Sequence, residues 1–592
     1  MKPSKPANKK KNLRRNHIAT LCAALLLTVF ANLIGHYLFA RLDLTAERRY
    51  TISKSTKRLL RGLEEPVLFR VYLEGDLTGD YQRLQNETRE MLNQFRAYSK
   101  YVDYEFVNPN EVKNQQERQQ FLQKLAKKGI QPSYLQVKTA NGVEQQMIFP
   151  AADVSHKGHE TSIQLLQNLS NFLSPDMALN NSIQNLEYVL SNAIRGLARA
   201  VKPRVGFTYG HGEPDNRELY DILMALYDNY TLENVNLTED INALTGRTRG
   251  TDSAIHLANK YDVLVVAQPR QPFSDQELYI LDQFVMYGGR VLWLIDPLNA
   301  SLDSLQSQDQ AMATRLPLRL DEMLFNYGVR VNADLIEDIR CRPIPLTVGM
   351  EGDRPQIALR PWFYFPDVVP TSKHPIVANL DIIKTDFVSS IDLVDNTSAQ
   401  QVAKSVLLTT SEYCRVKNAP VIIDLNEAKV DINQLDQRLF SKRNLPVAVL
   451  LEGTFQSMWR NRLTPEFTQL PEMGYRDTSA PTKMIVVSDG DIIKNRINYK
   501  EGYPYPLGYD LYTNTMYANR QFLLNAVDYL AGEEEGLATR SRTITMRKLN
   551  AMKATQQRTR HQALNVALPV ALALLLAPAV WVVRKKRYRK QA

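Results

Sequence analysis

Two long stretches without charged residues stand near the two ends of the chain. Residues 18–40 and residues 564–583 contain no Asp, Glu, Lys or Arg. At a rise of about 1.5 Å per residue, helices of these lengths span about 34 and 30 Å, enough to cross a bilayer core of about 30 Å. The pattern therefore predicts a transmembrane helix at each end of the chain.

Between these stretches, segments that alternate like β-strands are interspersed with segments whose apolar positions recur at helical spacing. Ser53 is a suitable N-cap for a first short helix. The elements expected after it are strands over residues 67–75, 102–107, 134–138 and 146–149 and helices over residues 84–100 and 183–200. This order predicts a first α/β domain over residues 43–200.

A second α/β unit is expected over residues 201–535. Its predicted strands cover residues 205–209, 261–269, 290–295, 446–453 and 483–487, and its predicted helices cover residues 218–227, 274–287, 321–327 and 520–532. Strands that alternate with helices favour a parallel, doubly wound sheet. Residues 343–370 are rich in proline and are expected to be irregular.

The formal net charge of +10 comes from the two ends of the chain. Residues 1–17 carry seven Lys or Arg and residues 584–592 carry six, without an acid, which leaves 60 basic and 63 acidic residues elsewhere. Because basic flanks stay in the cytoplasm, the tails predict an uncleaved two-pass protein of the inner membrane with both termini cytoplasmic and its bulk periplasmic. The nearly neutral remainder argues against nucleic acid as a partner.

The polar segment over residues 540–563, just before the second stretch, complicates this topology. Residues 540–561 carry seven Lys or Arg. A cytoplasmic location for that segment would place the two termini on opposite sides of the membrane. Long domains can translocate despite such charge, so the arrangement with both termini inside is preferred.

Cysteines are sparse and form no framework. Cys22 lies in the first apolar stretch, which leaves Cys341 and Cys414 outside it. In an oxidising compartment these two could form one disulfide, or they could be two unpaired thiols far apart in sequence.

The glycine turn over residues 210–214 is the first candidate site. It places His211 and Glu213 after a buried strand, where open α/β sheets bind ligands. One interpretation is contact with a ligand or partner. The other is a tight turn in which the two side chains cap the next helix or hold a neighbouring loop.

Two other polar clusters are weaker candidates. Asp489 and Asp491 flank a glycine after another buried strand and could bind a divalent cation, but a helix cap or Asx turn is the simpler reading. His156 and His159 stand three apart in what is expected to be a surface loop, without a further zinc ligand nearby. The sequence therefore predicts no metal, no cofactor and no catalytic residue. It also contains no Gly-Lys pair, which excludes a P-loop for ATP.

Several segments, in order along the chain, resemble one family. They are LTAERRYTIS, VYLEGD, RLQNETREMLNQFRAYSK, SIQNLEYVLSNAI, YGHGEP, SDGDIIKN, NRQFLLNAVDYL and RSRTITMRKL. Together they resemble the gliding-motility-associated ABC transporter auxiliary protein of Bacteroidota, the GldG type, often labelled substrate-binding. The resemblance implies an inner-membrane protein beside a separate ABC ATPase, which binds the ATP, and a separate ABC permease. It also implies a central domain with a class I amidotransferase-like fold.

The resemblance prompts a search for the catalytic cysteine of that fold, which would follow the strand over residues 290–295. Asp296 and Pro297 stand there instead. The preferred hypothesis is therefore a non-enzymatic accessory subunit for gliding motility or envelope transport, whose Asn32 and His36 help its first membrane helix pack on the permease. The alternatives are a periplasmic scaffold that binds envelope partners and a divergent envelope hydrolase with a site near His211.

Overall fold

The computed structural model describes most of the chain. The described residues are 18–30, 51–111, 114–128, 130, 132–139, 142–166, 175–199, 201–227, 229–238, 240–249, 255–305, 308–351, 354–378, 380–395, 402–429, 436–470, 474–498, 502–534, 536–537 and 557–589. Those between 51 and 537 belong to one compact unit, and the C-terminal helix belongs to a second. The division of residues 43–535 into two domains therefore stays a prediction, whereas the mixed α/β class is confirmed.

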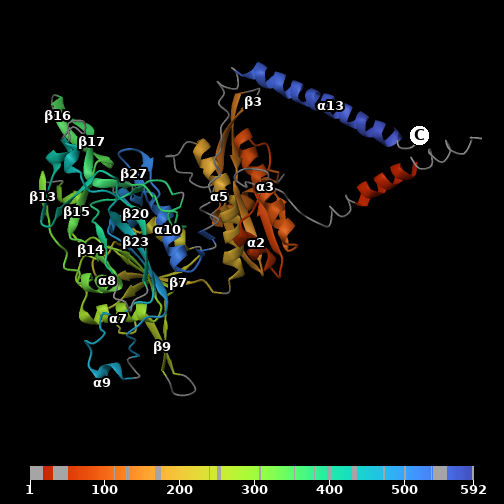
Figure 1. Cartoon of the computed structure of the whole chain (residues 1–592). Coiled ribbons are helices and arrows are strands. Elements are labelled where there is room, and N and C mark those ends of the chain that lie inside the picture. The colour runs from red at the N-terminus through yellow and green to blue at the C-terminus, as the bar shows by residue number, and fades with distance from the viewer. Residues whose placement is uncertain are drawn as a thin grey trace, which may run out of the picture. The chain divides into compact units, whose positions relative to one another are not determined.

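The first part of the chain forms a four-stranded sheet in the order β2-β1-β5-β6 (Figure 1). Its strands are β1 (Val67–Val71), β2 (Val102–Phe106), β5 (Ala151–His156) and β6 (His159–Gln164). β1 pairs in parallel with β2 and antiparallel with β5. The helices here are α2 (Lys54–Arg61), α3 (Gly79–Tyr98), α4 (Gln115–Lys127) and α5 (Pro175–Ala198), and β3 (Ser133–Thr139) and β4 (Gly142–Ile148) form a separate hairpin.

Most of the predicted elements in this part are present. The Ser53 hydroxyl accepts a hydrogen bond from the Thr56 backbone N–H, so the predicted N-cap is confirmed. The surface loop expected around His156 and His159 is wrong: these residues pair across the tight turn of the β5–β6 hairpin. Lys157 and Gly158, both with positive φ, form that turn, which short hairpins require.

The central part is built on a seven-stranded sheet in the order β20-β23-β24-β12-β11-β7-β8. Its strands are β7 (Arg204–Tyr209), β8 (Thr231–Asn236), β11 (Val263–Ala267), β12 (Arg290–Leu294), β20 (Val402–Thr409), β23 (Pro446–Gly453) and β24 (Thr482–Val487). β8, β7, β11, β12 and β24 run parallel, and β23 and β20 add an antiparallel edge. The predicted parallel arrangement thus covers five of the seven strands.

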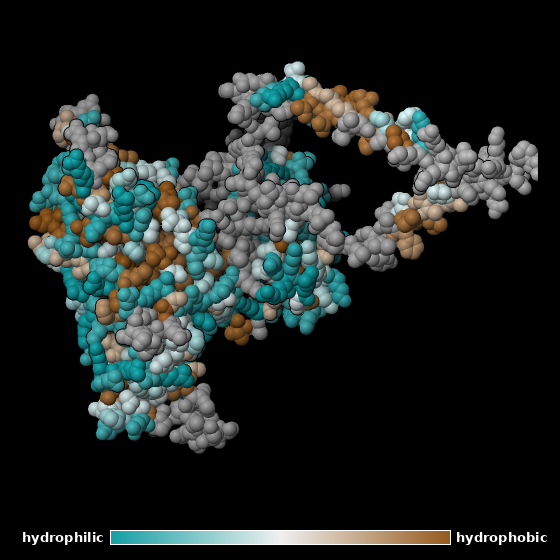
Figure 2. Space-filling model, in the orientation of Figure 1, coloured by the Kyte–Doolittle hydropathy of each residue, from teal (hydrophilic) through white to brown (hydrophobic). Residues whose placement is uncertain are grey.

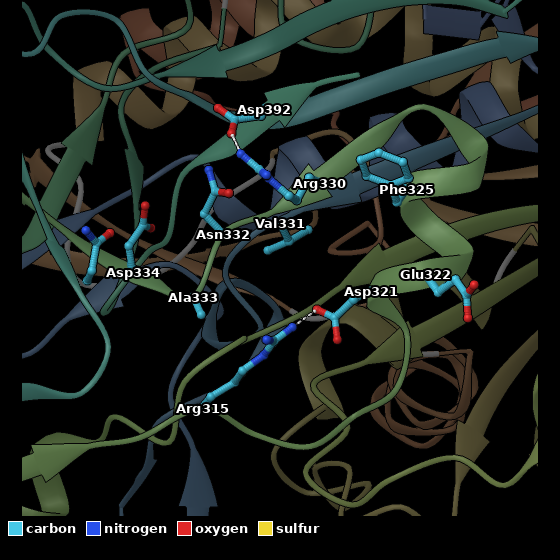
Figure 3. Close-up of a pocket in the computed structure, with 11 residues that line it drawn as sticks. Arg315, Asp321, Glu322, Phe325, Arg330, Val331, Asn332, Ala333, Asp334 and Asp392 are labelled. Carbon is cyan, nitrogen blue, oxygen red and sulfur yellow. Dashed lines mark hydrogen bonds and ion pairs between the residues drawn. The ribbon is translucent and has the colours of Figure 1, made fainter. Parts of the chain in front are cut away.

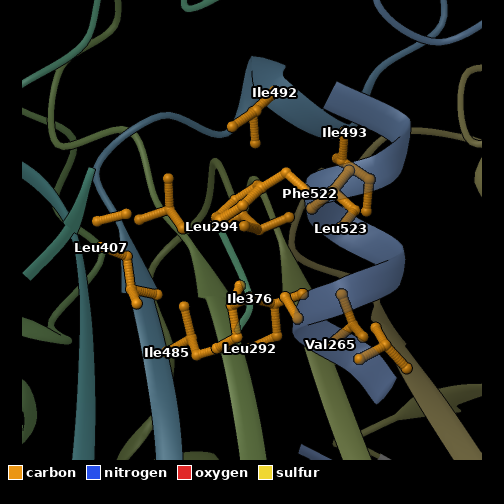
Figure 4. Close-up of a cluster of buried hydrophobic side chains, with 14 of the residues drawn as sticks. Val265, Leu292, Leu294, Ile376, Leu407, Ile485, Ile492, Ile493, Phe522 and Leu523 are labelled. Carbon is orange, nitrogen blue, oxygen red and sulfur yellow. The ribbon is translucent and has the colours of Figure 1, made fainter. Parts of the chain in front are cut away.

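Alternate residues of the central strands point to opposite faces of the sheet and belong to two hydrophobic layers. On one face, Val265, Leu292 and Ile485 pack against α6 (Tyr220–Tyr227) and α10 (Asn519–Leu530), as Figure 4 shows for Phe522 of α10. On the other face, side chains such as Trp293 pack against α7 (Asp275–Met286) and α8 (Asp321–Tyr327). Burial on both faces explains why these strands are almost entirely apolar.

A long insertion separates β12 from β24 and carries the largest departure from the sequence expectation. Most of the proline-rich residues 343–370 belong to an arm of the antiparallel strands β16 (Cys341–Glu351) and β17 (Arg354–Val368), not to an irregular loop. Proline lacks an N–H donor, but a third strand, β18 (Ile383–Lys384), joins the arm only at the last two residues of β17, so outward-facing N–H positions along the rest of the arm need no strand partner. The register shifts near Pro343, which is also where prolines are tolerated.

The remaining elements are short. The strands are β9 (Thr245–Arg249), β10 (Ile255–Asn259), β13 (Gln310–Ala313), β14 (Val329–Val331), β15 (Asp334–Asp338), β18 (Ile383–Lys384), β19 (Ile391–Leu393), β21 (Cys414–Asn418), β22 (Val421–Asp424), β25 (Ile497–Asn498), β26 (Tyr503–Pro504), β27 (Tyr509–Asp510) and β28 (Thr515–Met516). The helical turns are η1 (Leu302–Leu305), η2 (Leu425–Lys429), η4 (Gln437–Leu439), α9 (Pro465–Thr468) and η5 (Asp491–Ile493). Cys341 and Cys414, on β16 and β21, are free thiols.

Among the described residues, one helix is long and apolar enough to cross a membrane. It covers Arg558–Val582 within α13 (Arg558–Arg589), with Pro569 and Pro578 inside it. Its exposed apolar side chains appear brown in Figure 2. A shorter apolar helix covers Ile18–Phe30. The rest of the predicted first span, with Asn32 and His36, and most of the predicted polar segment over residues 540–563 lie outside the described residues.

Candidate functional site

The two turns singled out in the sequence meet at one edge of the central sheet. β7, β11, β12 and β24 are parallel neighbours, so the loops that follow them emerge together at their carboxyl ends. The chain passes from β7 to β8 on one side and returns to β11 on the other side. The turn over residues 210–214 therefore lies at the topological switch point, where open α/β sheets bind ligands.

His211 is buried in this turn, with 4% of its surface exposed. Its ring stacks on Phe273 with the ring centroids 4.1 Å apart, and its Nε2 lies 3.1 Å from Oε1 of Glu277. The His211 carbonyl accepts hydrogen bonds from the backbone N–H groups of Arg270 and Gln271. His211 therefore ties the turn after β7 to the loop after β11 and to the start of α7.

Glu213 and Glu277 complete this arrangement. Oε2 of Glu213 accepts the His211 backbone N–H at 2.6 Å, and its Oε1 lies 3.8 Å from Nδ1 of the ring. Glu277 forms a capping box with Ser274 at the start of α7. Burial alone would raise the pKa of Glu277, but hydrogen bonds from Ser274 and His211 lower it overall. The geometry favours the second reading of the turn, in which its polar side chains hold neighbouring segments.

Two glycines make the tight turn possible. Gly210 and Gly212 have φ values of +112° and +79°, which residues with a Cβ rarely adopt. A Cβ on Gly212 would also come 3.1 Å from Cβ of Arg270. The glycines that drew attention to this segment are therefore explained by backbone geometry and by the close approach of the next loop.

The second turn brings Asp489 and Asp491 beside Asp296, which directly follows β12. One carboxylate oxygen from each of the three lies within 4.8 Å of the others. Asp296 accepts hydrogen bonds from the Gly490 N–H at 2.5 Å and from the Gln268 amide at 2.6 Å. It also lies 3.2 Å from the Arg270 guanidinium, so Arg270 links this cluster to His211.

The remaining carboxylates are also held by protein donors. Asp489 accepts the backbone N–H groups of Asp491 at 2.8 Å and of Asp386 at 2.9 Å. Asp491 pairs with Lys494 at 3.3 Å. The Asp489–Asp491 contact is the local turn expected from the sequence, whereas the Asp386 contact joins the turn to the long insertion.

Burial and mutual repulsion shift the pKa values of the carboxyl groups in this cluster. Burial first, and then repulsion from Asp491, raises the pKa of Asp296 to about 6. Burial, followed by the charges of Asp296, Asp491 and Asp386, raises the pKa of Asp489 well above its ordinary value. Both buried carboxyl groups therefore keep a proton to a higher pH than an exposed aspartate does, even though both accept hydrogen bonds.

Three clustered carboxylates could in principle hold a divalent cation, which needs about six oxygen ligands. Here the oxygens of Asp296 face an amide N–H₂, a backbone N–H and a guanidinium, and Asp491 faces an ammonium group. These donors compete with a cation for the same carboxylate oxygens. The donor set fits a hydrogen-bonded carboxylate cluster better than a metal site.

The ionic network continues beyond Asp386. This carboxylate pairs with Arg342, which is 3% exposed and also lies 3.3 Å from Asp510 and 3.4 Å from Asp367. The aromatic ring of Phe365 covers the guanidinium with its centroid at 4.9 Å. A single buried arginine thus gathers carboxylates from the long insertion and from the segment before α10.

Sequence reasoning singled out His211, Glu213, Asp489 and Asp491 and missed several of their partners. The missed residues are Gln268, Arg270, Phe273, Glu277, Asp296, Arg342, Asp386 and Lys494. One signal was available for Asp296, because a carboxylate directly after a fully apolar parallel strand must emerge at the carboxyl edge. Arg342 and Asp386 lie in the insertion and carried no such signal.

Comparisons with known proteins cover the same region. Residues 202–526 match the family model described as "ABC-type uncharacterized transport system", and residues 46–155 match a domain of unknown function (DUF7088). An uncharacterized protein of Borreliella burgdorferi is 19% identical over 455 residues, which cover 75% of this chain and 78% of that protein.

A solved structure described as the "mmIFT52 N-terminal domain" is 12% identical, with a TM-score of 0.29, over 55% of this chain and 96% of that one. That likeness is too weak to establish the fold. The family model, in contrast, spans more than half of the 592 residues and runs from just before β7 into α10. The chain belongs to the family of ABC-type uncharacterized transport system auxiliary proteins.

Proposed function

We propose that this chain is a membrane-anchored, non-enzymatic accessory subunit of an ABC transporter, working beside a separate ATPase and a separate permease. The family match over residues 202–526 carries the proposal. The absence of any Gly-Lys pair in the sequence supports it, because ATP binding by a P-loop then has to come from another chain.

The chemistry of the carboxyl edge supports a non-enzymatic role. His211 stacks on Phe273 and contacts Glu277, and no cysteine follows β12, where Asp296 and Pro297 stand. Burial, more than its charged neighbours, raises the pKa of the Cys341 thiol to about 12, so this thiol stays protonated at neutral pH and is a poor nucleophile.

The proposed topology is two-pass, in the inner membrane, with both termini cytoplasmic and the bulk of the chain periplasmic. The apolar helices Ile18–Phe30 and Arg558–Val582 support the two anchors. The basic residues at the two ends support the orientation. A protein tethered at both ends cannot shuttle cargo, so we assign it a role in gating the permease or coupling it to periplasmic envelope partners. Its resemblance to the GldG type supports gliding motility or envelope transport as the process.

The direct test is to extract the tagged full-length protein from native membranes with a gentle detergent and identify by mass spectrometry what co-purifies. We expect an ABC ATPase and a multi-span permease in a fixed ratio. Recovery of neither, under conditions that keep an unrelated ABC transporter of the same membrane intact, would contradict the proposal.

Two further measurements separate the parts of the proposal. Replacing Asn32 and His36 with leucine should weaken co-purification of the permease, because polar side chains in a membrane helix stabilise helix–helix contacts. Leucine in place of Thr28, whose hydroxyl bonds its own helix at the Ala24 carbonyl, is the matched control. Protease added to spheroplasts should digest the central part and spare epitope tags at both termini. Loss of either tag would overturn the topology without touching the accessory role.

A further inference from the structure

An open groove is lined by residues of α8, β14, β15, β19 and β21 and of the loops beside them (Figure 3). Its cavity volume is about 720 Å³, within the range of about 300–1,000 Å³ typical of ligand sites. Val331 and Asp334 are buried at its floor, and Phe325 lies on its α8 side. None of the residues singled out from the sequence lines it.

Two exposed ion pairs flank the groove. Nη2 of Arg315 lies 2.7 Å from Oδ1 of Asp321, and Nη2 of Arg330 lies 2.5 Å from Oδ2 of Asp392. All four side chains are at least half exposed. A guanidinium has five N–H donors and a carboxylate has about four acceptor sites, so these few contacts leave each pair with spare donors and acceptors side by side.

The acidic side chains of the lining are all bonded to protein donors. Besides the two pairs, Glu322 is paired with Arg462, and buried Asp334 accepts the backbone N–H of Ser390 at 2.8 Å and its hydroxyl at 2.6 Å. Each lining carboxylate therefore already has a donor. A cationic ligand would have to displace these partners, and an anionic ligand would meet an excess of acids over arginines.

Phe325 supplies the apolar component of the groove. Its side chain is 52% exposed, although most phenylalanines in a folded protein are buried. An exposed aromatic ring beside hydrogen-bonding groups suits a ligand that has an apolar face and a polar rim. The half-buried Asn332 and the exposed Asn418 add amide donors and acceptors to that rim.

We propose that this groove binds a neutral, hydroxyl-rich ligand, namely a saccharide chain. A hydroxyl group donates and accepts at once, so neighbouring hydroxyls can donate to an aspartate and accept from the arginine paired with it. The C–H face of a sugar ring is the apolar surface that Phe325 can cover. Because the groove opens to solvent, it suits a segment of a longer chain. This inference requires no transporter partner and stands independently of the proposed accessory role.

The test is binding of neutral hexasaccharides to the full-length protein. The protein is purified in an amine-oxide detergent, because the sugar head groups of glycoside detergents would compete for the groove. Maltohexaose, cellohexaose and N-acetylated chitohexaose are titrated separately by calorimetry and by saturation-transfer NMR. The three probes separate plain glucans from N-acetylhexosamine chains as the source of the chemistry. We expect saturable binding of at least one of them.

Variants locate the site. Phe325→Ala should weaken binding at least tenfold and Arg330→Gln at least fivefold. Tyr413→Ala, which removes an aromatic ring of similar exposure (49%) outside the groove lining, should leave the affinity unchanged. Equal tryptophan fluorescence melting curves for the variants would show that they are folded.

Three outcomes would overturn the proposal. One is no saturable binding of any neutral hexasaccharide. Another is binding that both groove variants leave unchanged, which would place the sugar elsewhere. The third is tighter binding of charged probes, either oligogalacturonate or deacetylated chitohexaose, since that would mean recognition by charge.

Discussion

The carboxyl edge of the central sheet and the groove beside Phe325 use charged side chains in opposite ways. At the edge, Asp296, Asp489 and Arg342 are almost fully buried, and their partners come from segments far apart in the chain. In the groove, the Arg315–Asp321 and Arg330–Asp392 pairs are half exposed.

The difference indicates which of the two regions is free to bind. A buried ion pair that loses one partner leaves an uncompensated charge, so a ligand could enter the edge only by dismantling contacts that hold the insertion in place. An exposed pair contributes little and can be rearranged at small cost. We therefore assign the edge to architecture and the groove to recognition.

The sharpest way to break this comparison is to remove one arginine from each region. Arg342→Leu leaves the carboxylates of Asp367, Asp386 and Asp510 without their common partner and should lower the free energy of unfolding by about 3–5 kcal/mol. Arg330→Leu in the groove should cost less than about 1 kcal/mol. Urea unfolding of the full-length protein in detergent, followed by the fluorescence of buried Trp293 and Trp362, measures both. Similar losses for the two variants would remove the distinction.

A second pair of variants compares a buried ring at the carboxyl edge, His211, with an exposed ring in the groove, Phe325. His211→Ala removes a buried ring that stacks on Phe273 and contacts Glu277, and should cost about 2–4 kcal/mol. Phe325→Ala removes an exposed ring and should change the free energy of unfolding by less than about 0.5 kcal/mol. The same urea titration reports both values. A stable His211→Ala protein that no longer co-purifies with its partners would restore His211 as a contact residue.

A third variant tests how the protonation of Asp296 at the carboxyl edge affects stability. The pKa of Asp296 is raised in the folded protein to about 6, above about 3.9 in the unfolded chain. The folded state therefore binds more protons between those values, and the Asp296 contribution to stability falls as the pH rises from about 4 to 6. Above pH 6 the titration penalty is complete at up to about 3 kcal/mol, so Asp296→Asn should be more stable relative to the natural protein at pH 7–8 than at pH 4 by up to that amount.

Asp296→Asn keeps an oxygen for the Gly490 N–H and removes the charge, and its N–H₂ group then faces the donors of Gln268 and Arg270 at a cost that does not depend on pH. Its advantage over the natural protein should shrink as the pH falls from 6 to 4, in urea titrations at each pH. A gain that is independent of pH would mean that packing, not charge, produces it. Asp76→Asn, at an exposed carboxylate, is the control for general charge effects.

Sequence patterns predicted the repeating part of the fold well. Apolar runs such as residues 290–295 and the N-cap signal at Ser53 are local, and the structure has a strand and a capped helix there. The arm over β16 and β17 was missed because prolines usually mark irregular chain, and only the pairing of its two strands shows where the missing N–H groups do no harm.

The site was predicted less completely, for a physical reason. His211 and Asp489 were found because glycine turns follow their strands, but burial and partners decide what such residues do. The partner Asp386 lies 103 residues from Asp489, so no local pattern could reveal it. The groove carries no motif because its lining comes from several short elements, each with an ordinary composition.

The smallest expected effect is that of Arg330→Gln in the groove. Its dependence on pH should be opposite to that of Asp296→Asn at the carboxyl edge, which makes it the most discriminating test of the difference between the two regions. Burial would raise the pKa of Asp392, but hydrogen bonds from Arg330 and Asn332 lower it below its ordinary value. Such a group contributes stability above about pH 4 and loses it as the pH falls through the folded pKa. Arg330→Gln should therefore cost less than about 1 kcal/mol at neutral pH and progressively less as the pH falls below about 4. Asp296→Asn changes in the opposite direction over about pH 4–6. Urea titrations of both variants across pH 3–8 give the two profiles. If both moved in the same direction, the charges of the edge and the groove would not differ in kind, and the assignment of one to architecture and the other to recognition would fail.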